Sequence, residues 1–173
     1  MAIFMPRAAA LAALVLVGSA AARAALPDDD AAVYGFDDQM LEEPLAHPEW
    51  FKESFLDLGA DLAEAVAADK RGLMIYFGQQ RCAYCQKLMQ VNFGLEDIVE
   101  YTRANFDVIP IDIWGVAEVT DLGGQVLTEK ELAERENTVF TPSILFYDAE
   151  GREALRLRGY YPPYQFRAAL EYV

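Results

Sequence analysis

An unbroken apolar run from Leu73 to Phe77 lies between Gly72 and Gly78 and constrains the fold more than any other stretch of the chain. Apolar residues without polar alternation are typical of a strand buried on both faces, as in a parallel sheet covered by helices. Segments with helical spacing precede and follow the run. The sequence therefore predicts an α/β domain with helices on both sides of a central sheet.

The rest of the chain supplies the other elements of such a domain. The helices expected from apolar spacing and end signals cover about residues 60–70, 83–91, 95–105 and 162–173. Residues 107–113, "DVIPIDI", predict a further strand. Pro110 cannot donate a ladder hydrogen bond, so this strand is expected to have an unpaired or bulged side there.

The C-terminal part predicts how the sheet ends. Residues 143–159 hold an apolar strand, a turn at residues 148–151 and a strand in which leucines alternate with arginines, which is typical of a hairpin. A longer connection over residues 114–137 precedes it. There Thr128 and Glu131 have the spacing of a capping box, which predicts the start of a short helix.

The first 24 residues have the three parts of an export signal. Arg7 is followed by an uncharged apolar run over residues 8–17 and by the sequence Ala22-Arg23-Ala24. A charged start, a short apolar middle and an A-x-A end are the order found in cleaved signal peptides. The run is shorter than the roughly 20 residues that a membrane-spanning helix needs. We predict a signal peptide over residues 1–24, cleaved near Ala24, and a location in the periplasm.

Charge excludes one class of partner. Removal of the signal takes away Arg7 and Arg23 but no acidic residue, which leaves 12 basic and 28 acidic residues and a net charge of −16. Nucleic-acid phosphates would be repelled, so no nucleic acid is expected to bind. Export also bears on the cysteines, because disulfides form and persist outside the cytoplasm.

An acidic segment, residues 25–48, contains three prolines and no sustained hydrophobic period. We expect an irregular leader, held to the domain by Tyr34 and Phe36. The next residues, 50–58, fit either a helical turn or a short strand. The folded domain is expected over residues 49–173.

Cys82 and Cys85 are the two cysteines of the chain, and they follow the predicted buried strand. A disulfide between residues three apart closes a very small loop and removes little entropy from the unfolded chain, so it is a poor structural staple. A zinc site needs about three or four protein ligands, yet the chain adds one histidine, His47, in the leader. We expect His47 to be an exposed or packed loop residue. A redox pair is therefore favoured, with no metal and no cofactor.

The two cysteines have different roles in this hypothesis. Cys82 falls where the strand gives way to a helix, so its sulfur lies near free backbone N–H groups and the positive end of the helix dipole, which lower a thiol pKa. Cys85, one turn inside the helix, is expected to be more buried and to keep its proton longer. We predict that Cys82 attacks and Cys85 resolves. Arg81 adds positive charge beside them.

Thr141 and Pro142 precede the apolar residues "ILFY" far downstream. Proline is almost the only residue at which a cis peptide bond costs little. A cis bond at this place would expose main-chain groups to a partner. The dipeptide gains weight because a strand, a CxxC pair and a helix precede it and a hairpin and a helix follow it.

These features together resemble the thioredoxin superfamily over roughly residues 50–173. "FGQQRCAYCQKL" is similar to its redox motif, and "FTPSILFYDAEGREALRLRGY" to its proline loop and terminal hairpin. The resemblance implies a thioredoxin fold, a three-layer α/β/α domain whose central mixed sheet ends in an antiparallel hairpin. It also implies that Cys82 and Cys85 are the dithiol and that Pro142 is the cis-proline facing them. "WFKESFLDLGADLAEA" and "YFGQQRCAYCQKL" resemble, within the superfamily, exported thioredoxin-related proteins of the SoxW type.

Several positions depart from the thioredoxin pattern. The cysteines enclose Ala83 and Tyr84 instead of Gly-Pro, and Arg81 stands in place of a tryptophan. The enclosed dipeptide helps to set the reduction potential, which spans roughly −270 to −120 mV among proteins of this fold, so the direction of electron flow stays open. Tyr76 replaces a buried aspartate that accepts a proton in thioredoxin. Proton transfer to or from Cys85 must therefore use water or another group.

The main hypothesis is a periplasmic thiol–disulfide oxidoreductase that reduces disulfides of exported partner proteins through its dithiol. The SoxW resemblance implies sulfur-oxidation or cytochrome c maturation components as partners and a membrane thiol transporter as the electron donor. We expect a monomer. Two alternatives remain, namely a disulfide-forming oxidant or isomerase, and a non-catalytic binding module that uses the same fold.

Overall fold

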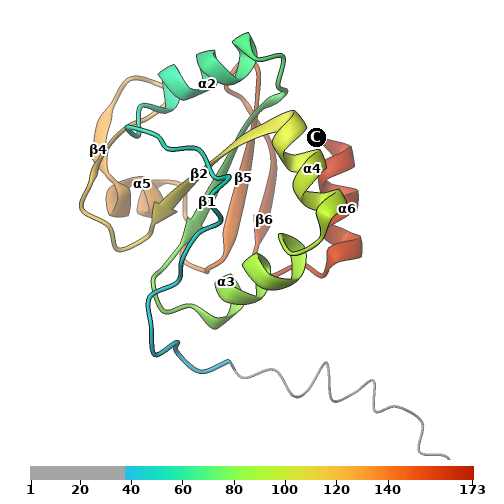
Figure 1. Ribbon diagram of the computed structural model, residues 1–173. Coiled ribbons are helices and arrows are strands. Elements are labelled where there is room, and N and C mark those ends of the chain that lie inside the picture. The colour runs from blue at the N-terminus through green and yellow to red at the C-terminus, as the bar shows by residue number, and fades with distance from the viewer. Residues whose placement is uncertain (1–37) are drawn as a thin grey trace, which may run out of the picture. The chain divides into compact units, whose positions relative to one another are not determined.

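The computed structural model describes residues 38–173 (Figure 1). The predicted signal peptide, residues 1–24, lies outside the described residues, as does the first part of the predicted leader with Tyr34 and Phe36. Within residues 38–173, no helix has the length and apolar character needed to cross a membrane. All the elements around the cysteine pair fall inside the described part.

A four-stranded sheet in the order β2-β1-β5-β6 forms the centre of the domain (Figure 1). Its strands are β2 (Phe106–Asp112), β1 (Gly72–Gly78), β5 (Ser143–Asp148) and β6 (Glu153–Arg158). β1 pairs in parallel with β2 and antiparallel with β5, and β5 pairs antiparallel with β6. The sheet is therefore mixed and ends in the predicted antiparallel hairpin.

β1 is buried along its whole length, which confirms the prediction from the apolar run. Met74 and Tyr76 belong to the apolar core on one face of the sheet, whereas Leu73, Ile75 and Phe77 belong to the core on the other face. Successive side chains of a strand point to opposite faces. One strand therefore supplies both cores.

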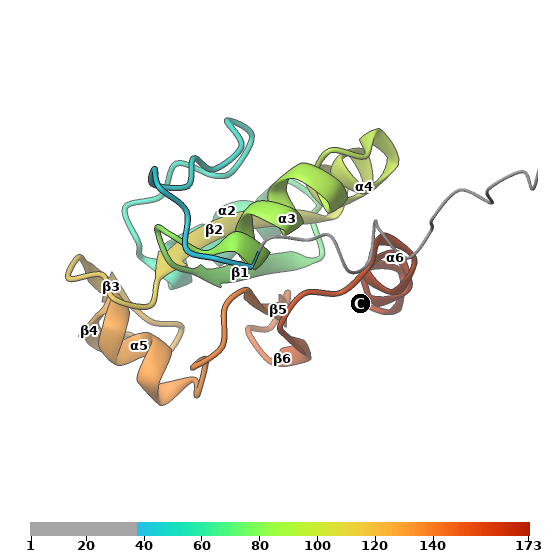
Figure 2. The ribbon, with the colours of Figure 1, turned by 90° about the horizontal axis from the view of Figure 1, so that it is seen from below.

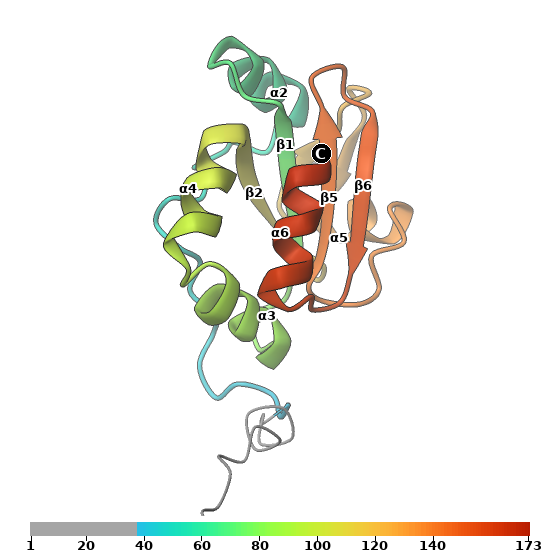
Figure 3. The same cartoon turned by 90° about the vertical axis from the view of Figure 1, so that its right-hand side faces the viewer.

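Three helices cover the face of the sheet that is toward the viewer in Figure 3, namely α3 (Ala83–Lys87), α4 (Glu96–Asn105) and α6 (Pro163–Tyr172). α3 continues into a single π-helical turn, η1 (Leu88–Asn92). Ile98 of α4 and Phe166 of α6 are buried in the same core as both cysteines. The helices predicted over residues 83–91, 95–105 and 162–173 are confirmed. The last turn of the first of these helices is π-helical instead of α-helical.

The other face carries α2 (Leu58–Ala67), α5 (Glu129–Arg135) and a small second sheet made of β3 (Glu118–Thr120) and β4 (Val126–Thr128). Leu58, Val119 and Leu132 from these elements pack in the core on this face. Figure 2 shows β3, β4 and α5 together on the side of the domain away from α6. The predicted three layers are confirmed.

Pro110 lies in β2, which pairs along its length with β1 alone among the strands of residues 38–173. The register with β1 runs through Pro110 without a shift. Proline is tolerated in an edge strand because its missing N–H can face the open side. The prediction of an unpaired side is confirmed, and no bulge is needed.

The helix predicted over residues 60–70 is present, but both of its predicted ends were wrong. α2 begins at Leu58, since the Asp57 side chain accepts a hydrogen bond from a backbone N–H of the first turn. It ends at Ala67, and Asp69 lies beyond it with a positive φ of 59°. Capping by one side chain has no periodic signal, so apolar spacing alone misplaced this helix.

The connection over residues 114–137 contains a hairpin, β3 and β4, that the sequence pattern did not predict. Each strand has three residues, which is too short for a recognisable alternation. The Asp121 carboxylate holds the turn by accepting from two backbone N–H groups, one of them that of Gly123 (2.8 Å). The capping box of Thr128 and Glu131 is confirmed, with both reciprocal hydrogen bonds present.

The N-terminal part of the described chain, residues 38–56, holds no helix or strand. The Leu45 N–H donates to the Gln80 carbonyl oxygen (2.7 Å), in the loop that precedes Cys82. Phe51 packs edge-on against Phe93, with ring centroids 5.7 Å apart. Backbone bonds and aromatic contacts therefore hold this segment against the domain. Of the two forms expected for residues 50–58, each is found only at the end of the stretch, where Asp57 makes an isolated β-bridge with Thr120 and Leu58 begins α2.

We predict that Thr128→Ala lowers the free energy of unfolding by about 1 kcal/mol, because it removes the oxygen that accepts from the Glu131 N–H at the start of α5. Thr128→Ser keeps that oxygen and serves as the matched control, with a clearly smaller loss. Urea unfolding followed by circular dichroism measures both variants. Equal losses in the two would show that the cap does not stabilise the domain.

Candidate active site

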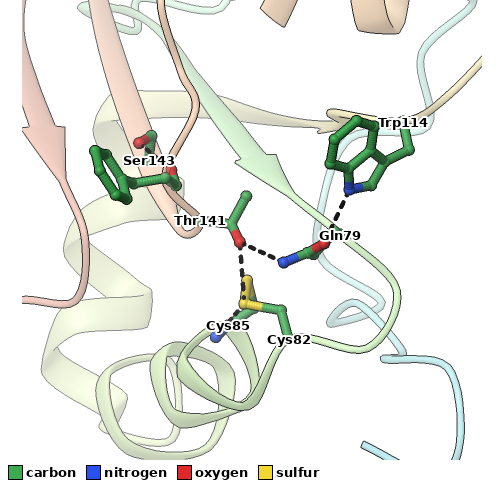
Figure 4. The surroundings of a disulfide bond; sticks show 7 residues. Gln79, Cys82, Cys85, Trp114, Thr141 and Ser143 are labelled. Carbon is green, nitrogen blue, oxygen red and sulfur yellow. Dashed lines mark hydrogen bonds between the residues drawn. A yellow bond between two sulfur atoms is a disulfide. The ribbon is translucent and has the colours of Figure 1, made fainter. Parts of the chain in front are cut away.

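Cys82 and Cys85 lie where the loop after β1 meets α3. Cys82 is the N-cap of α3, and Cys85 lies in its first turn. Their sulfurs form a disulfide with an S–S distance of 2.11 Å and a Cα–Cα distance of 5.1 Å (Figure 4). The structure thus joins the two predicted redox residues at the N-terminus of a helix.

The two cysteines differ in their exposure to solvent. Cys82 is 6% exposed, whereas Cys85 is 0% exposed and lies in the core with Leu88 and Phe93. Both cysteines are buried, and Cys82 is the more exposed of the two. Cys85 is fully buried, and its sulfur is bonded to the Cys82 sulfur.

Two hydrogen-bond donors face the Cys82 sulfur. The Cys85 backbone N–H lies 3.0 Å from Cys82 Sγ, and the Thr141 hydroxyl lies 3.3 Å from it (Figure 4). A donor that faces a sulfur favours its charged form. Both groups therefore face the sulfur that the sequence predicts to attack.

Thr141 reaches the disulfide from the loop before β5. The Thr141–Pro142 peptide bond is cis. The Pro142 carbonyl oxygen accepts from the Gly159 N–H (2.8 Å), and the Ser143 hydroxyl donates to the Phe140 carbonyl oxygen (2.5 Å). These bonds tie the loop to the end of β6 and to itself, so that the Thr141 hydroxyl is held toward the disulfide.

Two further residues belong to this site, although the sequence pattern did not indicate them. Gln79 Nε2 donates to Thr141 Oγ1 (3.1 Å), and Trp114 Nε1 donates to Gln79 Oε1 (2.9 Å). Gln79 follows β1 and Trp114 follows β2, and these parallel strands end at the same edge of the sheet. Side chains with hydrogen-bonding groups, placed within two residues of the ends of neighbouring parallel strands, were the signal that could have indicated them.

Tyr76 lies on the face of β1 that contributes to the core around both cysteines, and it is fully buried. Its hydroxyl has no hydrogen-bond partner among residues 38–173. Burial raises the pKa of Tyr76, and the nearby Asp112 carboxylate adds to the rise. Tyr76 is therefore a neutral phenol and no substitute for a carboxylate proton acceptor.

Arg81, Ala83 and Tyr84 surround the pair in different ways. Ala83 is 6% exposed and packs into the domain. Tyr84 is 42% exposed, and Arg81 is also exposed. The structure thus places Tyr84 and Arg81 on the surface beside Cys82, while Ala83 is part of the packed side of α3.

His47 packs on aromatic rings. Its ring stacks on Phe51 (centroids 5.6 Å apart) and meets the ring of Tyr76 edge-on (5.5 Å). Loss of water on these faces lowers the pKa of His47, and the Asp112 carboxylate partly opposes that effect. In the described part of the chain, no group of three His, Cys, Asp or Glu side chains is placed to hold a metal ion.

A surface hollow of about 710 Å³ adjoins the site, and Gln79, Arg81 and Trp114 are among the residues that line it. Trp114 is 63% exposed, and Phe140, the residue before Thr141, is 67% exposed. The loops that reach the site thus carry two exposed aromatic side chains.

The fold and the site together define a class of protein. A buried strand leads into a CxxC pair at the start of a helix, and a proline loop from a distant part of the chain faces that pair. Residues 58–173 match the family described as a thioredoxin-like domain, and the chain belongs to this family. No curated protein sequence matches the chain.

Solved structures share the fold at low sequence identity. A thioredoxin-fold protein from Helicobacter pylori is similar with a TM-score of 0.56 and 23% identity, over 71% of this chain and 75% of that one. A thioredoxin from Thermus thermophilus gives 0.51 and 24%, over 66% and 82%. A DsbH oxidoreductase gives 0.50 and 13%, over 74% and 90%. The predicted thioredoxin fold is confirmed.

We predict that Tyr76→Phe raises the free energy of unfolding by up to about 1 kcal/mol, because it removes a buried hydroxyl that lacks a partner and keeps the packed ring. Tyr76→Asp restores the carboxylate found in thioredoxin but buries it among apolar side chains, so a loss of several kcal/mol is expected. Urea unfolding at neutral pH measures both. A clear loss of stability in Tyr76→Phe would show that the hydroxyl is bonded.

Proposed function

We propose that this chain is a thiol–disulfide oxidoreductase that reduces disulfides of partner proteins. The observation that carries the proposal is the asymmetry of the pair. Cys82 is 6% exposed and its Sγ faces two donors, whereas Cys85 is 0% exposed. An attacking thiolate needs the first environment, and a resolving thiol is protected by the second. Membership of the thioredoxin-like family supports the same chemistry.

The reaction uses the two cysteines in turn. The Cys82 thiolate attacks one sulfur of the partner's disulfide, a bond forms between them, and the other partner sulfur leaves as a thiolate. Cys85 then loses its proton and attacks Cys82 Sγ, which releases the second partner sulfur. The partner gains two electrons and, once protonated, two protons. The pair ends as the Cys82–Cys85 disulfide found in the structure.

The proposed setting is the periplasm, where the chain acts as a monomer. The export signal predicted over residues 1–24 supports this location. The resemblance to SoxW-type proteins supports sulfur-oxidation or cytochrome c maturation components as partners. It also supports a membrane thiol transporter as the donor that returns the disulfide to the dithiol.

A disulfide-forming oxidant is the second candidate, and one observation favours it. The two donors on Cys82 Sγ stabilise its thiolate, and a stabilised thiolate favours the reduced form of the pair. A pair that prefers to be reduced oxidises its partners more readily. The reduction potential therefore separates the two candidates.

We predict that Cys82→Ser abolishes the reduction of insulin by the protein in the presence of dithiothreitol, because the attacking sulfur is lost. Cys85→Ser keeps the attacking sulfur but lacks the resolving one. When the reduced variant is mixed with insulin after dithiothreitol has been removed, a mixed disulfide is expected to accumulate and to be visible on a non-reducing gel. A non-catalytic binding module would show no insulin reduction in the unmodified protein and no adduct in the Cys85→Ser variant.

We predict that the Cys82–Cys85 pair has a reduction potential closer to about −270 mV than to about −120 mV, as a reductase requires. Equilibration in buffers of reduced and oxidised glutathione, followed by alkylation of free thiols, measures it. A reduction potential near about −120 mV would contradict the reductase and support the disulfide-forming oxidant.

A further inference from the structure

A continuous hydrogen-bond chain runs from the surface to the Cys82 sulfur (Figure 4). Trp114 Nε1 donates to Gln79 Oε1 at 2.9 Å, and Gln79 Nε2 donates to Thr141 Oγ1 at 3.1 Å. Thr141 Oγ1 then lies 3.3 Å from Cys82 Sγ. Its outer end, Trp114, is 63% exposed, and its inner end is the sulfur proposed to attack.

The indole sets the direction of this chain because its N–H can donate but not accept. Gln79 must therefore turn its carbonyl oxygen toward Trp114, which leaves its amide nitrogen facing Thr141. The opposite orientation of the amide would place two donors against each other. With a donor already facing it, the Thr141 oxygen accepts from Gln79, and its single proton is left for the sulfur.

The Thr141 hydroxyl matters most when the pair is reduced. A sulfur in a disulfide is a weak acceptor, whereas a thiolate takes a charge-assisted hydrogen bond. The other donor on Cys82, the Cys85 backbone N–H, follows from the helix start itself. The side-chain donor, the Thr141 hydroxyl, is different because its orientation depends on its hydrogen bond with Gln79.

We propose that Gln79 and Trp114 are positioning residues that hold the Thr141 hydroxyl as a donor to the Cys82 sulfur and thereby stabilise its thiolate. The inference rests on the proposed function, because it concerns the same sulfur. On reduction two electrons enter the disulfide, the Cys82 sulfur keeps a negative charge, and Cys85 takes one proton from solvent. A donor that stabilises this charge favours the reduced pair.

Charged groups also act on the Cys82 sulfur. Those around the site are Arg81, Lys87, Asp112, Glu129 and His47 in its protonated form. Asp112 Oδ1 accepts from the Trp114 backbone N–H (2.9 Å), a bond that a change of the indole leaves in place. The substitutions below alter none of these charges. The effects of the charged groups on the Cys82 pKa therefore cancel when a variant is compared with the unmodified protein.

The test measures the pKa of Cys82 in the reduced full chain from the pH dependence of its alkylation by iodoacetamide, since Cys85 is buried. Thr141→Val removes the hydroxyl at nearly constant shape and is expected to lower the acid dissociation constant about tenfold, which is about one pKa unit. Thr141→Ser keeps a hydroxyl and is expected to restore the original value.

Trp114→Phe is the decisive variant, because it keeps an aromatic ring and touches neither cysteine nor Thr141. Without the indole N–H, the Gln79 amide can turn its oxygen toward Thr141 and compete for the hydroxyl proton. We expect the acid dissociation constant of Cys82 to fall about threefold, a part of the full loss of the donor. Trp50→Phe removes another indole N–H, away from the site, and is expected to leave the constant unchanged.

The double variant Thr141→Val/Trp114→Phe tests whether Trp114 acts through Thr141. If it does, the double variant has the same Cys82 pKa as Thr141→Val alone, because neighbouring residues in one network are not additive. The reduction potential of Thr141→Val is expected to be more negative by about 30 mV, the equivalent of the tenfold change. The inference would be overturned if the Cys82 pKa shifts of the two single variants added up in the double variant. An unchanged Cys82 pKa in Thr141→Val or in Trp114→Phe would also overturn it.

The same experiments separate this inference from the proposed function. If the unmodified protein reduces insulin and neither variant shifts the pKa, the inference is wrong and the proposed function stands. If the variants shift the pKa as expected but the unmodified protein reduces no disulfide, the positioning role stands and the proposed function is wrong.

Discussion

The pairing of buried β1 with β2 on one side and β5 on the other is the interaction on which the site depends. β1 and β2 are parallel and their last residues, Gly78 and Asp112, are register partners, so both strands end at one edge of the sheet. β5 is antiparallel to β1, and therefore starts at that edge. The loops that carry Cys82, Trp114 and Thr141 meet there for this reason. Apolar side chains on both faces of β1 stabilise the arrangement, because any shift of the strand would expose them to water.

The site combines a packed interior with an open front. Behind Cys82, the buried Cys85 and Tyr76 belong to one apolar core, and the Tyr76 phenol is kept neutral by its burial. In front, the Thr141 hydroxyl faces the Cys82 sulfur, and the side chains of Trp114 and Phe140 are exposed. In the proposed reaction, the order of attack and resolution follows from the deeper burial of Cys85.

Local patterns predicted the elements that are long and periodic. β1, the helices after the cysteine pair and the C-terminal hairpin each carry several apolar residues in a fixed spacing, so burial could be inferred from the sequence. The start of α2 and the β3–β4 hairpin were missed for the opposite reason. Single side chains, those of Asp57 and Asp121, determine them through hydrogen bonds to nearby backbone N–H groups. Such bonds leave no repeat in the sequence.

The sequence by itself determined the chemistry of this protein, since two cysteines three residues apart after a buried strand can form a redox pair at the start of a helix. Tertiary structure alone decided what surrounds the reactive sulfur. Trp114 and Gln79 are 35 residues apart, Gln79 and Thr141 are 62 apart, and Thr141 and Cys82 are 59 apart. No local pattern relates residues at such separations. They meet because strand pairing brings the ends of three chain segments to one edge of the sheet, where hydrogen bonds can form between them.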